Sequence, residues 1–188
     1  MGRWEPNARG RLGRAAMELY VERGFDQTTV AEIAERAGLT KRTFFRHYAD
    51  KRDVLFAGME PLRDLMVRAI AEAPADLTPV AVAARAVGAA AEMIQERPET
   101  VRMRQAVIDA HPELQEREMV KLAMLTACIA DLLRERGLEL WPARLVAEVA
   151  MAAFRVAFAR WIADGAEGPL TLVVQESMAL LTASVTAG

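Results

Sequence analysis

A short basic segment, residues 41–48, holds the side chains of this sequence best suited to bind a polyanion. Its polar members can donate to phosphates or to the edges of bases, and they are Lys41, Arg42, Thr43 and Arg46. Phe44 and Tyr48 are four residues apart, so in a helix both rings lie on one side and can anchor it. The segment is predicted to be an amphipathic helix with one basic face.

The residues before this segment supply the signals of a second helix and a tight turn. Thr29 and Glu32 have the spacing of a capping box, Gly38 ends the helix that follows, and Thr40 caps the next one. Helix, turn and helix over residues 29–48 form the helix-turn-helix arrangement, whose second helix enters the major groove of DNA. The alternative is a short helix of a bundle with a solvated basic face, and the combination of caps favours the DNA-binding interpretation.

Other kinds of chemistry lack the residues they need. The chain has one cysteine, Cys128, and two histidines, His47 and His111, which is too few for a disulfide or a metal site. It has no glycine-rich phosphate loop and no Ser/His/Asp or Cys/His constellation. We expect no enzyme, no cofactor and no metal; a catalytic role would depend on scattered carboxylates.

The whole chain has the composition of an all-α protein. Hydrophobic residues make up 53%, and Ala, Leu, Arg and Glu dominate without strand-like alternation. Pro61 falls inside one expected helix, where we expect a kink or a break; whether it also acts as a hinge stays open. The nine expected helices span about residues 7–23, 29–37, 40–48, 50–73, 79–96, 99–109, 112–136, 142–164 and 170–183.

The charge is distributed unevenly, which bears on the partner. Residues 1–57 contain eleven Lys and Arg against eight Asp and Glu, whereas the rest of the chain is acidic. The longest apolar stretch, residues 80–94, is broken by Arg85 and Glu92 and is too short to cross a bilayer. The first residues also lack the apolar core of a signal peptide. We therefore expect a soluble, cytoplasmic protein with no membrane contact and a basic head.

About 45 contiguous residues near the N-terminus resemble the DNA-binding domain of TetR-family regulators. The matching positions are Arg14, Leu19, Tyr20, Gly24, Phe25, Thr28, Thr29, Val30, Ile33, Ala34, Ala37, Gly38, Leu39, Thr40, Thr43, Phe44, Phe45, Tyr48, Lys51, Val54 and Leu55. The resemblance implies a helix-turn-helix DNA-binding domain in residues 1–55 and an effector-binding and dimerisation domain in residues 56–188. It also implies a homodimer formed through the last two helices.

The resemblance assigns roles to individual residues. It implies that Thr29 and Lys51 hold phosphates, and that the second helix of the motif faces the groove. The expected DNA-binding set is Thr29, Thr40, Lys41, Arg42, Thr43, Phe45, Arg46, His47 and Lys51. The family usually has Tyr at Phe45 and Phe at Tyr48, so the usual phosphate contact of the first hydroxyl is lost, and Arg46 is a candidate to replace it. For His47 the alternative is an ordinary polar surface residue.

The body of the chain suggests an apolar effector site. Flexible thioethers and aromatic rings suit an adaptable pocket for an elongated, largely apolar molecule, although each of them also suits a helical core. The residues expected to line the site are Met103, Val107, Met124, Cys128, Phe154 and Phe158. Arg102, Arg104 or Arg155 can pair with an anionic group on the effector, or form surface ion pairs instead.

These observations predict a ligand-responsive transcriptional regulator. We expect a repressor that binds a palindromic double-stranded operator as a homodimer and is released by a small, largely apolar effector. The main alternative is a helical small-molecule-binding protein that has lost specific DNA binding, which the exchange at Phe45 would fit. Activation in place of repression, and binding promoted by the effector, also stay open.

Overall fold

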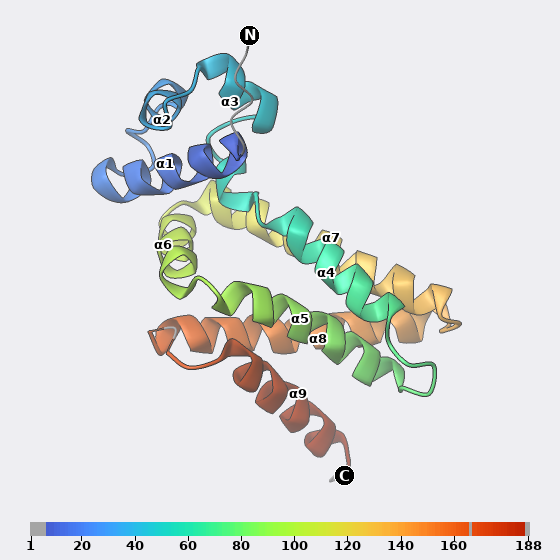
Figure 1. The fold of residues 1–188 in the computed structure, drawn as a ribbon. Helices are drawn as coiled ribbons and strands as arrows, with labels where there is room; N and C mark the ends of the chain where they lie inside the picture. The colour runs from blue at the N-terminus through green and yellow to red at the C-terminus, as the bar shows by residue number, and fades with distance from the viewer. Residues whose placement is uncertain (1–6, 166, 187–188) are drawn as a thin grey trace. The chain divides into compact units, whose positions relative to one another are not determined.

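The computed structural model describes residues 7–165 and 167–186, with side chains up to Leu181. This part of the chain contains nine α-helices, one 3-10 turn and no strand, which confirms the all-α prediction (Figure 1). The elements are α1 (Ala8–Arg23), α2 (Val30–Arg36), α3 (Lys41–His47), the 3-10 turn η1 (Asp53–Phe56), α4 (Met59–Ala71), α5 (Pro79–Gln95), α6 (Pro98–Asp109), α7 (Pro112–Glu135), α8 (Leu140–Ala163) and α9 (Leu170–Thr186).

The chain forms two compact units. The first contains the residues up to Gly58 together with Met103–Glu118, and the second contains Met59–Arg102 and the residues from Met119 onward. The end of α6 and the start of α7 therefore belong to the same unit as the helix-turn-helix. The expected DNA-binding segment, residues 1–55, does not include this stretch, because the pairing of residues so far apart in sequence leaves no local pattern.

In the first unit, α1 packs on both α2 and α3 (Figure 1). Leu12 and Leu19 of α1, Ile33 of α2 and Phe44 of α3 are almost fully buried and form its small core. Burying each such side chain stabilises the fold by about 1.5–3 kcal/mol. The two short helices of the motif depend on this packing, because seven-residue helices are too short to be stable alone.

One expected helix, residues 50–73, is interrupted. The 3-10 turn η1 ends at Phe56, and α4 begins at Met59 after a turn. Pro61 consequently lies in the first turn of α4, where its missing N–H removes no helical hydrogen bond. The kink or break expected at Pro61 was therefore wrong in its position, since the interruption lies at residues 57–58, ahead of the proline.

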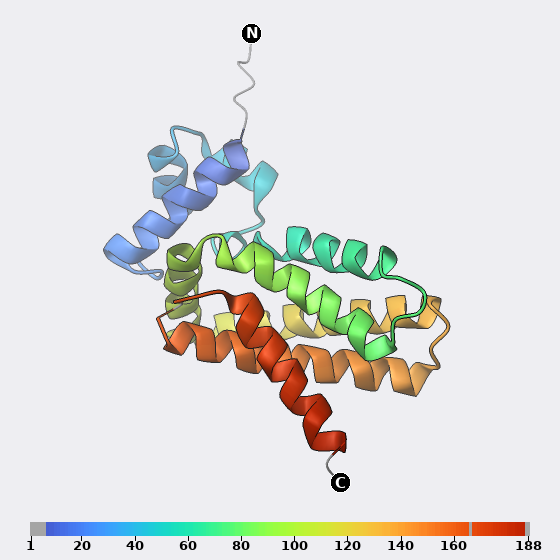
Figure 2. The same ribbon diagram turned by 60° about the horizontal axis from the view of Figure 1, so that its bottom comes forward.

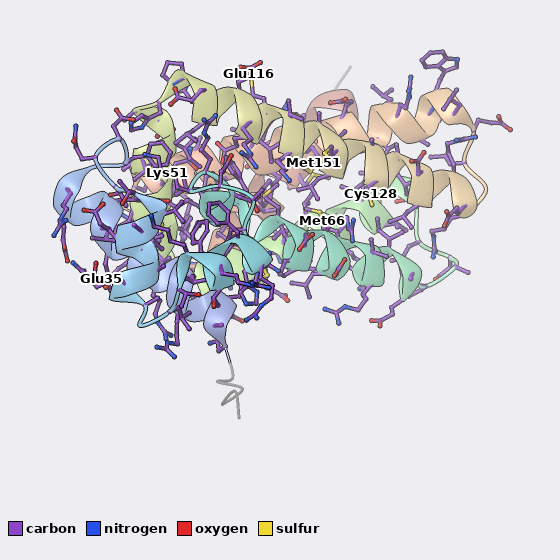
Figure 3. The ribbon with its side chains drawn as sticks, turned by 90° about the horizontal axis from the view of Figure 1, so that it is seen from above. Glu35, Lys51, Met66, Glu116, Cys128 and Met151 are labelled. Carbon is purple, nitrogen blue, oxygen red and sulfur yellow. The ribbon has the colours of Figure 1, made fainter. Side chains whose placement is uncertain are left out.

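In the second unit, α5 is the central helix: it packs on α4, α8 and α9, and α8 packs on α9 (Figure 2). Small buried alanines of α5, such as Ala83 and Ala86, allow this close approach. Met66 of α4 and Met151 of α8 are buried in the core, and Figure 3 labels both. No helix among the described residues is long and apolar enough to span a membrane.

Candidate nucleic-acid interface

The first helix of the motif begins with a complete capping box. The Thr29 hydroxyl accepts a hydrogen bond from the Glu32 N–H at 3.3 Å, and the Glu32 carboxylate accepts from the Thr29 N–H at 2.9 Å. The Thr29 hydroxyl also donates to this carboxylate at 2.8 Å. These hydrogen bonds hold the pKa of the Glu32 carboxyl below its ordinary value, so the carboxylate form is the one that caps α2.

The turn of the motif is closed by a Schellman arrangement. The Gly38 N–H donates to the Glu35 carbonyl and the Leu39 N–H to the Ala34 carbonyl, each at 2.8 Å. Gly38 has a φ of 65°, a left-handed conformation that glycine adopts without strain. The Arg11 guanidinium of α1 also donates to the carbonyl of Ala37. The angle between α2 and α3 is thus fixed by the backbone of the turn and by one arginine.

The second helix of the motif has a buried aromatic side. Phe44 is fully buried, its ring centroid lies 5.5 Å from that of Tyr48, and the Tyr48 hydroxyl donates to the Arg9 carbonyl at 3.0 Å. Burial raises the pKa of this hydroxyl. The TetR-family resemblance leads one to expect phenylalanine at position 48. Tyr48 therefore has a structural role here, because the hydrogen bond from its hydroxyl connects the end of α3 to α1.

The opposite side of α3 is exposed and basic. Lys41, Arg42, Phe45 and Arg46 are exposed, and they occupy adjacent positions on one helical face. Thr40 caps the helix by accepting from the Thr43 N–H at 3.1 Å, and the two hydroxyls lie 3.0 Å apart. Three cations and one phenyl ring thus form a surface that a polyanion can approach.

Two residues of the expected DNA-binding set are placed differently from the exposed four. His47 is half-buried, and its Nε2 atom is buried with no hydrogen-bond partner among the described residues. The Lys51 ammonium donates to the carbonyls of Phe25, Asp26 and Thr28 at 2.8, 3.1 and 3.0 Å. An ammonium has three N–H donors, so in this conformation Lys51 clamps the loop between α1 and α2. Figure 3 labels Lys51.

A second set of contacts joins α6 and α7 to the turn η1 within the first unit. The Arg117 guanidinium pairs with the carboxylates of Asp50 at 3.4 Å and Asp53 at 3.2 Å. The Arg104 Nε donates to the Leu55 carbonyl at 2.6 Å. Both guanidiniums also lie over the ring of Phe56, that of Arg104 at 5.3 Å and that of Arg117 at 5.5 Å from the ring centroid. We call this group of residues the η1 clamp; it consists of Asp50, Asp53, Leu55, Phe56, Arg104 and Arg117.

Sequence reasoning missed the η1 clamp. It considered Arg104 only as a partner for an anionic effector or a surface ion pair, and the structure pairs Arg104 with Glu118 at 2.9 Å. No signal in the sequence distinguishes Arg104 and Arg117 from the other arginines, because their partners in the η1 clamp lie 49 to 67 residues away.

The residues expected to line an effector site are dispersed. Met103 and Val107 belong to the first unit, whereas the other four belong to the second. Phe154 and Phe158 stack with centroids 6.3 Å apart, Met124 is exposed, and burial raises the pKa of the half-buried Cys128 thiol. None of the six lines either of two cavities among the described residues of the second unit, whose volumes are about 550 and 370 Å³.

The larger cavity lies among α4, α5 and α9, and it was not predicted. Four of its ten lining residues are alanine or glycine from α5, and Arg85, Glu92 and Gln175 add polar groups. The signal available in the sequence was the recurrence of Ala81, Ala84 and Gly88 every three to four residues, because small side chains on one helical face leave space.

Two families match the chain, one in each part. The family described as "Bacterial regulatory proteins, tetR family" matches residues 13–57, and the family described as "MftR C-terminal domain" matches residues 77–186. The second match alone covers more than half of the 188 residues.

Two curated relatives are transcriptional regulators. The chain is 30% identical to the transcriptional activator FasR of Mycolicibacterium smegmatis over 159 residues, which cover 81% of this chain and 71% of FasR. It is 36% identical to the transcriptional regulator TcmR of Streptomyces glaucescens over 72 residues, and this match spans only 32% of TcmR and 38% of this chain.

Solved structures share the fold over nearly the whole chain. The fatty acid degradation regulator FadR of Bacillus halodurans superposes with a TM-score of 0.67 at 19% identity, covering 95% of this chain and 96% of that one. The repressor FadR of Thermus thermophilus, solved in complex with lauroyl-CoA, has a TM-score of 0.54 at 28% identity and covers 93% of both chains.

Proposed function

Because the chain belongs to the TetR family of transcriptional regulators, we propose that it is a ligand-responsive repressor that binds a palindromic operator as a homodimer. A small, largely apolar effector releases it from DNA. Members of the family are regulators and not enzymes, which agrees with the expectation from the sequence.

The observation that carries this proposal is the two-sided character of α3. Phe44 and Tyr48 anchor one side in the core, and Lys41, Arg42 and Arg46 are exposed together on the other. A basic face on the second helix of a helix-turn-helix is what contact with phosphates and guanine edges in the major groove requires. The basic charge of residues 1–57 adds an attraction to DNA.

Four further residues of the proposed DNA-binding set, Thr29, Thr40, Thr43 and Lys51, have protein partners in this structure. For Thr29 a phosphate contact would replace the bond from its hydroxyl to Glu32, and for Lys51 it would replace one of three bonds to carbonyls. Thr40 and Thr43 are engaged with each other in the helix cap. We propose Lys41, Arg42 and Arg46 as the principal contacts, with Thr29, Thr40, Thr43, His47 and Lys51 at their margin.

The proposed dimer interface lies on α8 and α9. Trp141, Leu145 and Val156 of α8 are 72%, 65% and 65% exposed, and Leu172 and Leu180 of α9 are also exposed. Side chains spaced in this way along a helix form a stripe, and an exposed apolar stripe of this kind marks a contact with another protein surface. Pairing of two such helix pairs gives a four-helix bundle and a symmetric dimer.

For the effector, we propose a molecule with a long apolar chain. The Thermus thermophilus repressor was solved with lauroyl-CoA, so a fatty acyl-CoA is the first ligand to test. Two sites are candidates: the surroundings of the stacked Phe154 and Phe158, and the cavity among α4, α5 and α9. The first would require Phe158 to move away from Phe154 and Trp161, whose rings it contacts.

The η1 clamp supplies a route for coupling. Helices α6 and α7 each run from one unit into the other, and Arg104 and Arg117 lie on the portions that belong to the first unit. An effector that displaced either helix would act on Asp53 and Leu55 directly. The free energy by which the effector weakens DNA binding can be no larger than the difference between its binding free energies for the DNA-binding and the released conformation.

Selection of DNA from a random pool by the purified protein tests the proposal. We expect an enriched palindrome whose half-sites lie about one helical turn apart, and release of that DNA by lauroyl-CoA but not by coenzyme A alone. If a folded dimer enriches no symmetric motif, the proposal is wrong, and the alternative of a helical small-molecule-binding protein without specific DNA binding is favoured.

A further inference from the structure

Phe45 is a large apolar side chain in a surface of cations. The residue is 58% exposed, and Lys41, Arg42 and Arg46 lie at positions −4, −3 and +1 from it along the same helix. Single exposed apolar residues are common on protein surfaces. This one, however, is positioned on the face of α3 that would meet DNA.

The ring of Phe45 packs against a buried ring, that of Phe44. Its centroid lies 5.5 Å from that of Phe44 with the planes at 84°, an edge-to-face contact. Phe44 is itself fully buried and is in contact with Tyr48. The buried ring therefore limits the rotamers of Phe45 and directs its exposed part outward, so little conformational freedom is lost when that part meets a ligand.

The chemistry of the ring limits what it can recognise. A phenyl group has no hydrogen-bond donor or acceptor, so it cannot bind a phosphate, and it cannot pair with the polar groups of guanine, cytosine or adenine. The one apolar group that a base pair presents in the major groove is the C5-methyl of thymine. The flanking cations can bind the neighbouring phosphates and leave the ring against the base edges.

We infer that Phe45 is a specificity-determining residue that recognises the methyl group of one thymine in each operator half-site. This inference rests on the proposed function, since it requires α3 to lie in the major groove. It adds a sequence preference that the cations alone do not supply, because contacts to phosphate carry no sequence information.

The test replaces thymine by deoxyuridine, which lacks the methyl group and keeps base pairing unchanged. Each thymine of the selected operator is replaced in turn, in both half-sites together, and the Kd of each probe is measured. For the unaltered protein we expect one position at which replacement weakens binding about 15-fold, or about fourfold per methyl group. At that position Phe45→Ala should bind thymine and deoxyuridine probes equally, whereas Phe45→Leu should still distinguish them.

Val21→Ala is the matched control, because Val21 is 59% exposed and lies on α1. It should discriminate as the unaltered protein does. If no thymine shows the effect, or if Phe45→Ala weakens binding to both probes and still distinguishes them, the inference is overturned while operator binding stands. If no operator is selected at all, the proposed function fails, and this inference fails with it.

Discussion

The Arg117 guanidinium lies 3.2 Å from the Asp53 carboxylate, which connects the first turns of α7 to the turn that follows the helix-turn-helix. The two residues are 64 positions apart in sequence. Together with the bond from Arg104 to the Leu55 carbonyl, this pair fixes η1 from two helices that also extend into the second unit. The DNA-binding helices and the proposed effector-binding unit therefore share two continuous structural elements.

Replacing Arg117 by Ala should lower the free energy of unfolding by about 1 kcal/mol, because two partly exposed ion pairs contribute about 0.2–1 kcal/mol each. Urea denaturation followed by circular dichroism measures the change. Arg134→Ala is the control, since Arg134 lies on the same helix and only approaches Asp131 at 3.8 Å on the surface. Equal stability of the two variants would mean that the ion pairs of the η1 clamp contribute nothing.

Replacing Lys51 by Ala should destabilise the protein by about 2 kcal/mol. Two partly buried carbonyls and one exposed carbonyl of the loop between α1 and α2 lose a charged donor. One buried hydrogen bond to a charged group is worth about 1.5–3 kcal/mol, and solvent replaces much of the loss where the bond is exposed. Lys41→Ala removes the same charge from an exposed position and should leave the urea midpoint unchanged. Loss of operator binding by Lys51→Ala at unaltered stability would instead show that this ammonium binds phosphate.

The helices could be located from the sequence wherever a local signal marks their ends. Thr29, Gly38 and Thr40 act at short range, through hydrogen bonds to residues three to five positions away, so the bounds of α2 and α3 follow from the order of residues alone. The basic face of α3 follows from the same spacing. These elements could be predicted because neighbours in sequence determine them.

The rest depends on contacts between distant residues. The η1 clamp and the three carbonyls around Lys51 join segments that lie 23 to 67 residues apart in sequence. An exposed lysine and a lysine that clamps a loop look identical in a sequence. The proposed effector residues face the same difficulty, because a methionine on a helix fits a core, a pocket or, as at Met124, the surface.

Charged substitutions on α8 should dissociate the proposed dimer. Leu145→Glu combined with Val156→Glu places four carboxylates in a symmetric interface, and the desolvation of charges there should outweigh the apolar contact. Analytical ultracentrifugation should then report a monomer. Met124→Glu changes a side chain of similar exposure, 62%, on α7 and should remain a dimer. Dissociation of the Met124 variant alone would move the interface to α7.

Acidification should weaken the start of α2. The pKa of the Glu32 carboxyl is lower in the folded protein than in the unfolded chain, chiefly because of the hydrogen bond from Thr29. The stabilisation of the fold by this carboxylate is complete above the pKa of the unfolded chain, about 4.3, and is lost as the pH falls through the pKa of the folded protein. Glu32→Gln should therefore show a smaller loss of stability between pH 5 and pH 3 in urea titrations, and an unchanged pH dependence would exclude this role.

Affinity for the selected operator tests the central claim, that α3 is the DNA-recognition helix. The double variant Arg42→Ala with Arg46→Ala should keep its fold and lose affinity by at least about 30-fold. The slope of the logarithm of the binding constant against the logarithm of salt concentration should become shallower by about two units per half-site. The matched double variant Arg63→Ala with Arg68→Ala removes two exposed arginines of α4 and should bind as the unaltered protein does. Equal affinity of both double variants would contradict the claim.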